Sequence, residues 1–192
     1  METLIAMRHA ESVFNERGVL NGDPTIPGGI TDRGREQAGR ARDQLASTPV
    51  DLCVTTNFQR SIETADIVLA GRDISRLVVE LLSDPPNGDF ELRPYGELEA
   101  WRAANGLEAP LPGTERTLRE CFETIRQGFI VVASRPEASV LAVIHGLAIS
   151  WLLGSVGRSV PAEQAVPVFI AGDDLDAMIG ATGDDVLRLW SG

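Results

Sequence analysis

Four short apolar runs, separated by segments with helical periodicity, restrict the folds open to this chain of 192 residues more than any other feature. The runs are Thr3–Met7, Asp51–Thr55, Leu77–Leu82 and Ser139–Ile144. Each is bounded by turn or helix signals, as is typical of buried parallel strands. Between them, Thr31–Ser47 and Phe58–Ala70 gather their apolar residues on one helical face. The alternation predicts an α/β fold, a three-layer sandwich with a mostly parallel central sheet flanked by helices.

The rest of the chain predicts additions to one such domain, which we expect to span residues 1–192. After a proline-rich and glycine-rich loop, two helical segments, Glu97–Asn105 and Glu115–Ala133, predict a helical lid inserted at about residues 84–134. Thr114 is the expected N-cap of the second helix. The C-terminal segments predict further strands at the sheet edge, namely Val166–Ala171, Ala177–Ala181 and Val186–Trp190.

Composition excludes several classes of function. The net charge of −11 argues against nucleic acid as a partner, since such binding depends on clustered positive charge. No apolar stretch reaches the roughly 18 residues of a membrane span, and the N-terminus does not resemble a secretion signal, so we expect a cytoplasmic protein that binds no membrane. Cys53 and Cys121 show neither disulfide nor metal-ligand spacing and are expected to be buried and unreactive.

The only two histidines of the chain follow apolar runs directly: His9 comes after Leu-Ile-Ala-Met-Arg, and His145 after Leu-Ala-Val-Ile. Ligands of open parallel sheets bind at the carboxyl ends of the strands. A single histidine in such a place is more often a hydrogen-bonded core residue, but two at equivalent strand ends favour one shared crevice. We therefore expect both imidazoles in the same site.

Arginines are expected at the same edge of the sheet. Arg8 adjoins His9, and Arg60 lies near the start of the helix that follows the Asp51–Thr55 strand. A guanidinium offers a planar fork of donors that matches phosphate oxygens and stays charged at physiological pH. Helix N-termini after His9 and after His145 would add backbone N–H donors. The pattern predicts an oxyanion site that requires no metal ion or other cofactor.

Several motifs, in order along the chain, carry a resemblance to a known family. They are Arg8-His9-Ala10-Glu11-Ser12 with Asn15, then Ile30-Thr31-Asp32-Arg33-Gly34 with Gln37-Ala38, then Arg60-Ser61-Ile62-Glu63-Thr64-Ala65, and finally His145-Gly146. Together they resemble the histidine phosphatase superfamily, also called phosphoglycerate-mutase-like. Each motif alone is a modest signal, whereas all of them in order are specific.

The resemblance implies a role for each matching residue. It makes His9 the nucleophile that is phosphorylated, with Arg8, Arg60 and His145 gripping the phosphoryl oxygens and Asn15 often joining them. The loop Gly18–Gly29 and the lid segment Tyr95–Gly113 are expected to set specificity. The predicted substrate-binding residues are Arg8, Asn15, Asn21, Gly22, Arg60, His145 and Gly146.

The general acid for the leaving alcohol is where the chain departs from the common motif, because the family usually has a glutamate four residues before a glycine in the loop after the third strand. Counting back from Gly88 gives Asp84, which also follows the Leu77–Leu82 run directly. Asp84 is favoured over Glu91, which lies farther along the loop. An aspartate that only caps a turn before Pro85 is the structural alternative.

These residues favour a metal-independent phosphomonoesterase that acts on a small phosphorylated metabolite through a phosphohistidine on His9. Phosphoglycerate mutase activity is a second hypothesis, and a catalytically silent protein that binds phosphorylated ligands is a third. A metal hydrolase using the two histidines is disfavoured, because no His-Glu-x-x-His motif or clustered ligand set is present. The sequence leaves a homodimer open, since edge strands and tryptophans are expected at the surface.

Overall fold

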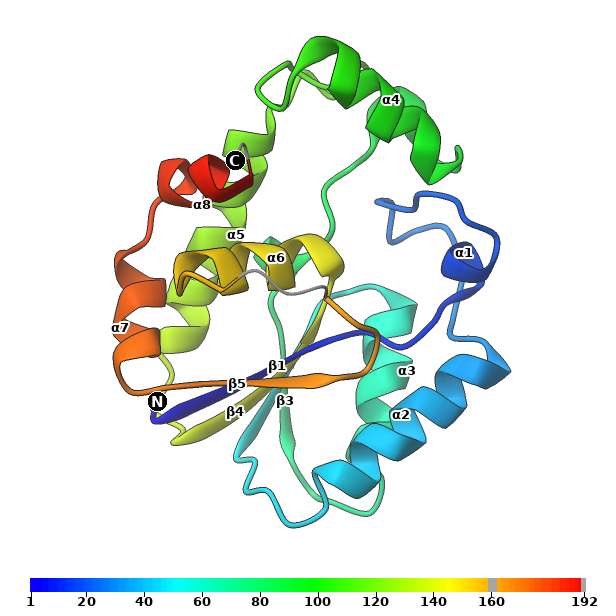
Figure 1. Ribbon diagram of the computed structural model, residues 1–192. Coiled ribbons are helices and arrows are strands. Elements are labelled where there is room, and N and C mark those ends of the chain that lie inside the picture. The colour runs from blue at the N-terminus through cyan, green and yellow to red at the C-terminus, as the bar shows by residue number, and fades with distance from the viewer. Residues whose placement is uncertain (159–161, 191–192) are drawn as a thin grey trace.

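The computed structural model describes residues 1–158 and 162–190, and its centre is a five-stranded sheet in the order β3-β2-β4-β1-β5 (Figure 1). The strands are β1 (Thr3–Arg8), β2 (Leu52–Thr55), β3 (Ser75–Val78), β4 (Ser139–Ile144) and β5 (Pro167–Ala171). All neighbouring pairs are parallel except β1 and β5, which are antiparallel. The predicted α/β fold with a mostly parallel sheet is confirmed.

Helices cover both faces of the sheet, so the fold has three layers. On one face lie α2 (Asp32–Gln44) and α3 (Gln59–Val68), and on the other α5 (Leu118–Ala133), α6 (Gly146–Ser155), α7 (Asp173–Gly180) and α8 (Gly183–Trp190) (Figure 1). Strand side chains alternate between faces: Ile5 and Met7 pack with α2 and α3, while Leu4 and Ala6 pack in the other layer. Because β1, β2 and β4 are buried on both sides, they form continuous apolar runs in the sequence.

Local signals in the sequence explain where the helices next to the site begin. Thr31 caps α2, its hydroxyl accepting a hydrogen bond from the Gly34 amide. A Cβ at Gly34 would lie 2.2 Å from the Glu11 carbonyl oxygen, so only glycine allows α2 to approach the loop after β1 this closely. The motif around Thr31 therefore packs the start of α2 against the loop that follows His9.

Part of the C-terminal prediction is wrong. Val166–Ala171 does contain an edge strand, β5, but Ala177–Ala181 and Val186–Trp190 lie mainly in α7 and α8. In these segments the apolar residues recur at helical spacing, and acidic residues occupy each first turn, where the helix dipole favours negative charge. Short apolar runs bounded by Gly-Asp do not distinguish a strand from a short helix.

The predicted strand Leu77–Leu82 is also shorter than expected. Strand β3 ends at Val78, and the 3₁₀ helix η1 (Glu80–Leu82) follows, with Leu82 fully buried. The apolar character of this run comes from one edge strand and one buried turn. Asp84 therefore reaches the sheet edge from the end of a 3₁₀ turn.

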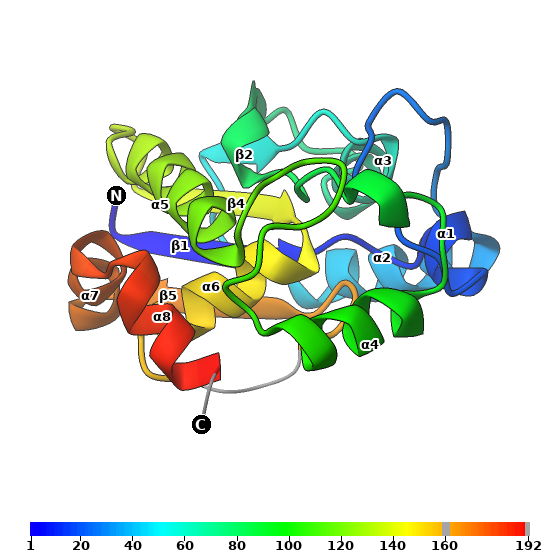
Figure 2. The same cartoon turned by 90° about the horizontal axis from the view of Figure 1, so that it is seen from above.

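Of the two helices assigned to the lid, only the first lies outside the three layers. Helix α4 (Tyr95–Asn105) is set apart on the side of α1 (Val13–Glu16) (Figure 1, Figure 2). Helix α5 buries Phe122, Ile125 and Phe129 in the main core, so its assignment to a lid is wrong. Its N-cap is Thr117, which forms a capping box with Glu120, and not Thr114 as predicted.

Several smaller expectations also have an outcome. Both cysteines are buried, and burial raises the pKa of the Cys53 thiol to about 11. Trp151 is fully buried and stacks on Phe129, so it offers no surface for a dimer, and the side chain of Trp190 lies outside the described residues. Within the part of the chain that the structure describes, no helix is long and apolar enough to span a membrane.

Candidate active site

The two histidines meet where β1 and β4 end side by side. His9 follows the last residue of β1, and His145 follows β4 and caps α6. Their ring centroids are 5.2 Å apart, and both side chains are buried. The adjacent parallel pairing of β1 and β4, which are more than 130 positions apart in sequence, produces this contact. The two imidazoles meet as expected, and His9 lines the pocket described below, whereas the fully buried His145 lies behind its wall.

The hydrogen bonds of His9 define its protonation state. Its Nδ1 lies 2.7 Å from the Ala10 carbonyl oxygen, which can only accept, and its Nε2 accepts a hydrogen bond from Arg60 Nε at 3.0 Å. The ring is therefore neutral, with the proton on Nδ1 and a lone pair on Nε2. Burial, followed by the nearby His145 and Arg60, holds the pKa of His9 well below its ordinary value. Nε2 is thus available as a nucleophile.

Arg60 extends from the first turn of α3 into the centre of the site. Its Nη1 donates to Asn21 Oδ1 at 2.5 Å and its Nη2 to the Asn21 carbonyl at 3.0 Å. Nη2 also pairs with Asp84 Oδ2 at 3.1 Å, and the guanidinium stacks over the Phe58 ring, 4.2 Å from its centroid. With only 4% of its surface exposed, Arg60 is a fixed cation directly beside His9 Nε2.

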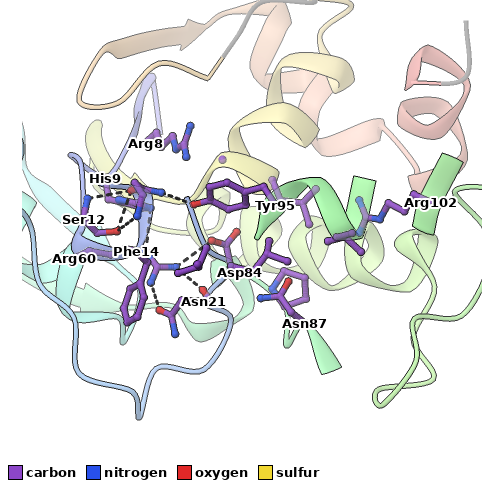
Figure 3. Close-up of a pocket in the computed structure, with 17 residues that line it drawn as sticks. Arg8, His9, Ser12, Phe14, Asn21, Arg60, Asp84, Asn87, Tyr95 and Arg102 are labelled. Atoms are coloured by element: carbon purple, nitrogen blue, oxygen red, sulfur yellow. Dashed lines mark hydrogen bonds and ion pairs between the residues drawn. The ribbon is translucent and has the colours of Figure 1, made fainter. Parts of the chain in front are cut away.

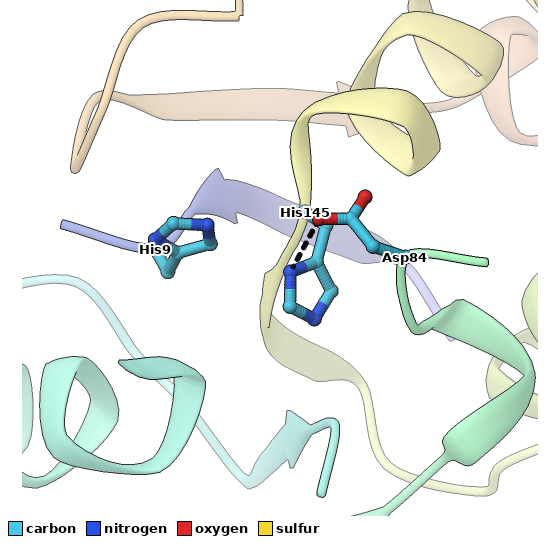
Figure 4. Close-up of side chains that lie close together, drawn as sticks. All are labelled: His9, Asp84 and His145. Carbon is cyan, nitrogen blue, oxygen red and sulfur yellow. Dashed lines mark ion pairs between the residues drawn. The ribbon is translucent and has the colours of Figure 1, made fainter. Parts of the chain in front are cut away.

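Asp84 and His145 are in contact on the other side of Arg60, with His145 Nδ1 and Asp84 Oδ2 3.2 Å apart (Figure 4). Thr56 Oγ1 lies 2.8 Å from His145 Nε2 and also accepts the Phe58 amide at 3.4 Å. Because the Asp84 carboxylate can only accept, the proton of His145 lies on Nδ1, and Nε2 accepts a hydrogen bond from the Thr56 hydroxyl. Burial acts to raise the pKa of Asp84, but His145 and then Arg60 outweigh it and bring that pKa below its usual range.

Arg8 contributes free donors. One of its terminal nitrogens donates to the Ala162 carbonyl at 3.1 Å, while its buried Nε has no hydrogen-bond partner within residues 1–158 and 162–190. A Cβ on Gly146 would lie 3.5 Å from that Nε, so α6 begins directly against the guanidinium. The N-cap side chain of α6 makes no capping hydrogen bond. Arg8 and the first amides of α6 thus offer unsatisfied donors to an anion.

The remaining predicted binding residues have different surroundings. Asn15 lines the pocket and donates from Nδ2 to the Tyr95 hydroxyl at 2.9 Å, and Asn21 lines it while holding Arg60. The Gly22 amide, however, donates to Glu91 Oε1 at 2.9 Å, and Gly22 does not line this pocket. The structure thus places Gly22 outside the pocket with its amide donor already used, which gives no support to its expected role as a substrate ligand.

Glu91 has a structural role that separates it from Asp84. Its carboxylate accepts hydrogen bonds from Gly22, Asn21 and Asn87, which ties the Gly18–Gly29 loop to the segment after β3. Glu91 does not line the pocket, whereas Asp84 does. The geometry agrees with the choice of Asp84 over Glu91.

The pocket has a volume of about 210 Å³, just below the range of roughly 300–1,000 Å³ typical of small-molecule sites (Figure 3). Its outer walls lie largely in the two segments expected to set specificity, Gly18–Gly29 and Tyr95–Gly113, although no individual wall residue was predicted. They comprise Phe14, Val19, Leu20, Tyr95, Leu98, Arg102 and Leu147. Three of them recur on α4 at spacings of three and four residues, and this signal could have marked the face of α4 that points into the site.

His9, Asp84 and His145 also bring potential metal-ligand atoms within 4.8 Å of one another. Arg60 contacts all three residues, at His9 Nε2, Asp84 Oδ2 and His145 Nδ1. A divalent cation among these atoms would have to displace a buried guanidinium or lie against it, which Coulomb repulsion opposes. The arrangement does not fit a metal centre.

A neutral imidazole whose Nε2 lone pair faces Arg60, two guanidinium groups, an uncapped helix N-terminus and a carboxylate are groups suited to phosphoryl transfer. The comparisons agree. The model of the histidine phosphatase superfamily (branch 1) matches residues 4–167, and the chain belongs to this family.

Two relatives illustrate how similar known proteins are to this chain. An adenosylcobalamin/alpha-ribazole phosphatase of Salmonella typhimurium is 30% identical over 48% of this chain and 45% of its own length, so the match spans less than half of that relative. The phosphatase PhoE of Bacillus subtilis, whose activity is uncharacterised, is 28% identical over 86% of this chain and 82% of its own length. Phosphoglycerate mutases also occur among the relatives.

The fold is shared with solved structures. YhfR of Bacillus stearothermophilus superposes with a TM-score of 0.76 over 94% of this chain and 93% of its own, at 22% sequence identity. At this identity the likeness concerns the fold alone. The resemblance inferred from the motifs is confirmed, and the chain is a member of a family of phosphoryl-handling enzymes.

Proposed function

We propose that this protein is a metal-independent phosphomonoesterase that hydrolyses a small phosphorylated metabolite through a phosphohistidine on His9. The observation that carries the proposal is the pair of hydrogen bonds on the His9 ring, from Nδ1 to the Ala10 carbonyl and from Arg60 Nε to Nε2. They hold the imidazole neutral, with its lone pair beside the cation that would grip the phosphoryl group.

The proposed reaction has two steps. His9 Nε2 attacks phosphorus in line, the bond to the ester oxygen breaks, and Asp84 delivers a proton to the departing alcohol. A water molecule, deprotonated by Asp84, then attacks the phosphohistidine, and the P–N bond breaks to release inorganic phosphate and neutral His9. Arg8, Arg60, His145 and the first amides of α6 stabilise charge on the equatorial oxygens.

Two experiments test this proposal together. A panel of phosphorylated sugars, glycerates, amino acids and nucleotides, with released phosphate as the readout, should show His9-dependent turnover that persists in excess chelator. Quenching with a ³²P-labelled substrate should trap an acid-labile phosphoenzyme. His145→Asn, which keeps the nucleophile, should still take up label slowly, whereas His9→Ala should take up none. Label on His9→Ala, or loss of turnover with chelator, contradicts the mechanism.

Mutase activity is the second candidate, because phosphoglycerate mutases occur among the relatives. A mutase returns the phosphoryl group from the enzyme to a second hydroxyl, whereas a phosphatase passes it to water. Incubation with 3-phosphoglycerate separates the two: accumulation of 2-phosphoglycerate without release of phosphate would establish a mutase. A silent binding protein would show neither product, although His9, Arg60 and His145 all converge in the site.

A further inference from the structure

Helix α4 presents a three-residue face to the pocket, formed by Tyr95, Leu98 and Arg102. Their spacing of three and then four positions places them on one side of the helix. The Tyr95 hydroxyl accepts a hydrogen bond from Asn15 Nδ2 at 2.9 Å, which fixes the N-terminal end of this face beside the catalytic groups. Farther along the helix, the same face presents the apolar Leu98 and then the guanidinium of Arg102.

Arg102 lies at the end of the pocket remote from His9. Figure 3 shows Tyr95 and Asp84 between the two side chains. Arg102 therefore lines the same cavity as Arg8 and Arg60 but on the other side of Tyr95 and Asp84 from His9. A substrate seated on His9 would extend past Tyr95 toward Arg102.

The charge of Arg102 is not compensated by the protein. Among the described residues, Arg60 pairs with Asp84, but the half-buried Arg102 guanidinium has no hydrogen-bond acceptor or carboxylate partner. Burial lowers the pKa of Arg102, and the nearby Cys121 thiol acts in the opposite direction without reversing this effect. Partial burial of a cation without a partner is unfavourable, and an anionic ligand would relieve it.

The pocket as a whole has an excess of positive charge. Three guanidinium groups line it, against the single carboxylate of Asp84, in a chain whose net charge is −11. One phosphate monoester at His9, with a charge of about −1.5 to −2, would balance most of that excess, but it would do so beside Arg8 and Arg60 and would leave Arg102 without an anion at the other end. Between the two ends the walls are apolar, with Leu20, Leu98 and Leu147.

From this arrangement we propose that Arg102 binds a second anionic group of the substrate, so that the enzyme prefers phosphate monoesters that also carry a carboxylate or a second phosphate. This inference rests on the proposed phosphatase function and narrows its substrate class. Arg102 is a specificity residue in this proposal and takes no part in breaking the P–O bond. Its guanidinium can grip either anion with two parallel hydrogen bonds.

Paired substrates that differ in the second anion test the proposal. 3-Phosphoglycerate and glycerol 3-phosphate differ by one carboxylate, and fructose 1,6-bisphosphate and fructose 6-phosphate differ by one phosphate. For each pair the ratio of kcat/KM values measures the preference for the second anion. For the pair whose second anion Arg102 binds, we expect the ratio of kcat/KM values to fall about 10-fold in Arg102→Gln, which corresponds to the loss of one hydrogen bond to a charged group. Which pair responds identifies the anion.

Two further variants make the result specific to the charge at this position. Arg102→Lys keeps the positive charge and should retain most of the preference for the doubly anionic substrate. If Arg102→Gln acted only by disturbing the packing, Arg102→Lys would lose the preference as well. Arg40→Gln removes an exposed arginine on α2 and should leave both ratios unchanged. Melting temperatures of all three variants check that each is folded.

The outcomes also separate this inference from the proposed function. His9-dependent hydrolysis of glycerol 3-phosphate, with ratios that are near one in the unmodified protein or unchanged in Arg102→Gln, refutes the role of Arg102 alone. If none of the four compounds is hydrolysed, the wider panel decides about the phosphatase proposal, and equilibrium binding of the four compounds decides about Arg102. If Arg102→Gln binds the doubly anionic member of a pair more weakly than the unmodified protein does, while Arg102→Lys and Arg40→Gln do not, the inference is supported. If Arg102→Gln and the unmodified protein bind it equally well, the inference is refuted.

Discussion

Replacing Asp84 by asparagine tests the assignment of the general acid most directly. The change preserves the shape of the side chain, and the amide oxygen of the new asparagine would still accept a hydrogen bond from Arg60 Nη2, now 3.1 Å from Asp84 Oδ2. The substitution removes the proton that the carboxyl group can transfer and the negative charge of the carboxylate. The position of Arg60 is also held by two bonds to Asn21, so the phosphoryl-binding groups should stay in place.

The size of the effect depends on the leaving group. Positioned acid catalysis contributes roughly 10²–10⁴-fold, about 2.7–5.4 kcal/mol of activation free energy, when the leaving alcohol is a poor one. An alkyl phosphate therefore loses this factor in Asp84→Asn. p-Nitrophenyl phosphate, whose phenolate departs without a proton, should lose far less. The comparison of kcat values for the two esters isolates the proton transfer from any general damage to the site.

A matched control is available in the same loop. Asp89 is exposed, does not line the pocket, and Asp89→Asn removes the same charge five positions away. It should leave both kcat values within a factor of about two, since surface substitutions of this kind rarely change the free energy by more than about 0.5 kcal/mol. Equal losses for the alkyl and the nitrophenyl ester in Asp84→Asn would refute general-acid catalysis by Asp84 and indicate a role in positioning only.

Three further outcomes follow from the geometry. Thr56→Val leaves the buried His145 Nε2 without its donor and should lower kcat/KM about 10-fold, while Thr56→Ser should restore it, as steady-state kinetics would show. Because the pKa of His9 is lowered, its ring should stay neutral below about pH 6.5, and an NMR titration with a midpoint at or above about 6.5 would contradict the proposed state of the nucleophile. Glu91→Ala removes the acceptor that anchors the Gly22 amide, so it should destabilise the fold by about 1–3 kcal/mol in urea unfolding and reduce turnover of alkyl and nitrophenyl esters by the same factor. A loss of turnover confined to the alkyl ester would instead make Glu91 the general acid.

The sequence was sufficient for the inner part of the site because that part follows from strand order. His9 and His145 each end a run of buried apolar residues, and parallel strands place such positions at one edge of a sheet. Arg60 follows β2 by a short connection, so its position is determined by the same rule. These residues required no knowledge of how any loop folds.

The outer part of the site was not predictable in the same way. Gly22 looked like a ligand because it lies in a loop near the expected pocket, but its amide is used by Glu91, 69 positions away. Such a contact between two irregular segments has no periodicity to reveal it. The short helices α7 and α8 illustrate the same limit, since a short apolar run fits either a strand or one helical turn.

The pKa of Asp84 is lowered in the free protein, so Asp84 can act as a general acid only if the bound substrate raises that pKa. In the free protein, His145 and Arg60 both favour the carboxylate. A bound phosphate brings negative charge next to Asp84 and takes donors from those same two residues, and both changes raise the pKa of its carboxyl. A phosphate monoester, whose second pKa is near about 6, can also arrive with the proton that the leaving oxygen needs. Asp84 would then relay a proton that enters with the substrate, which explains how a carboxylate held ionised in the free site can serve as the acid during turnover.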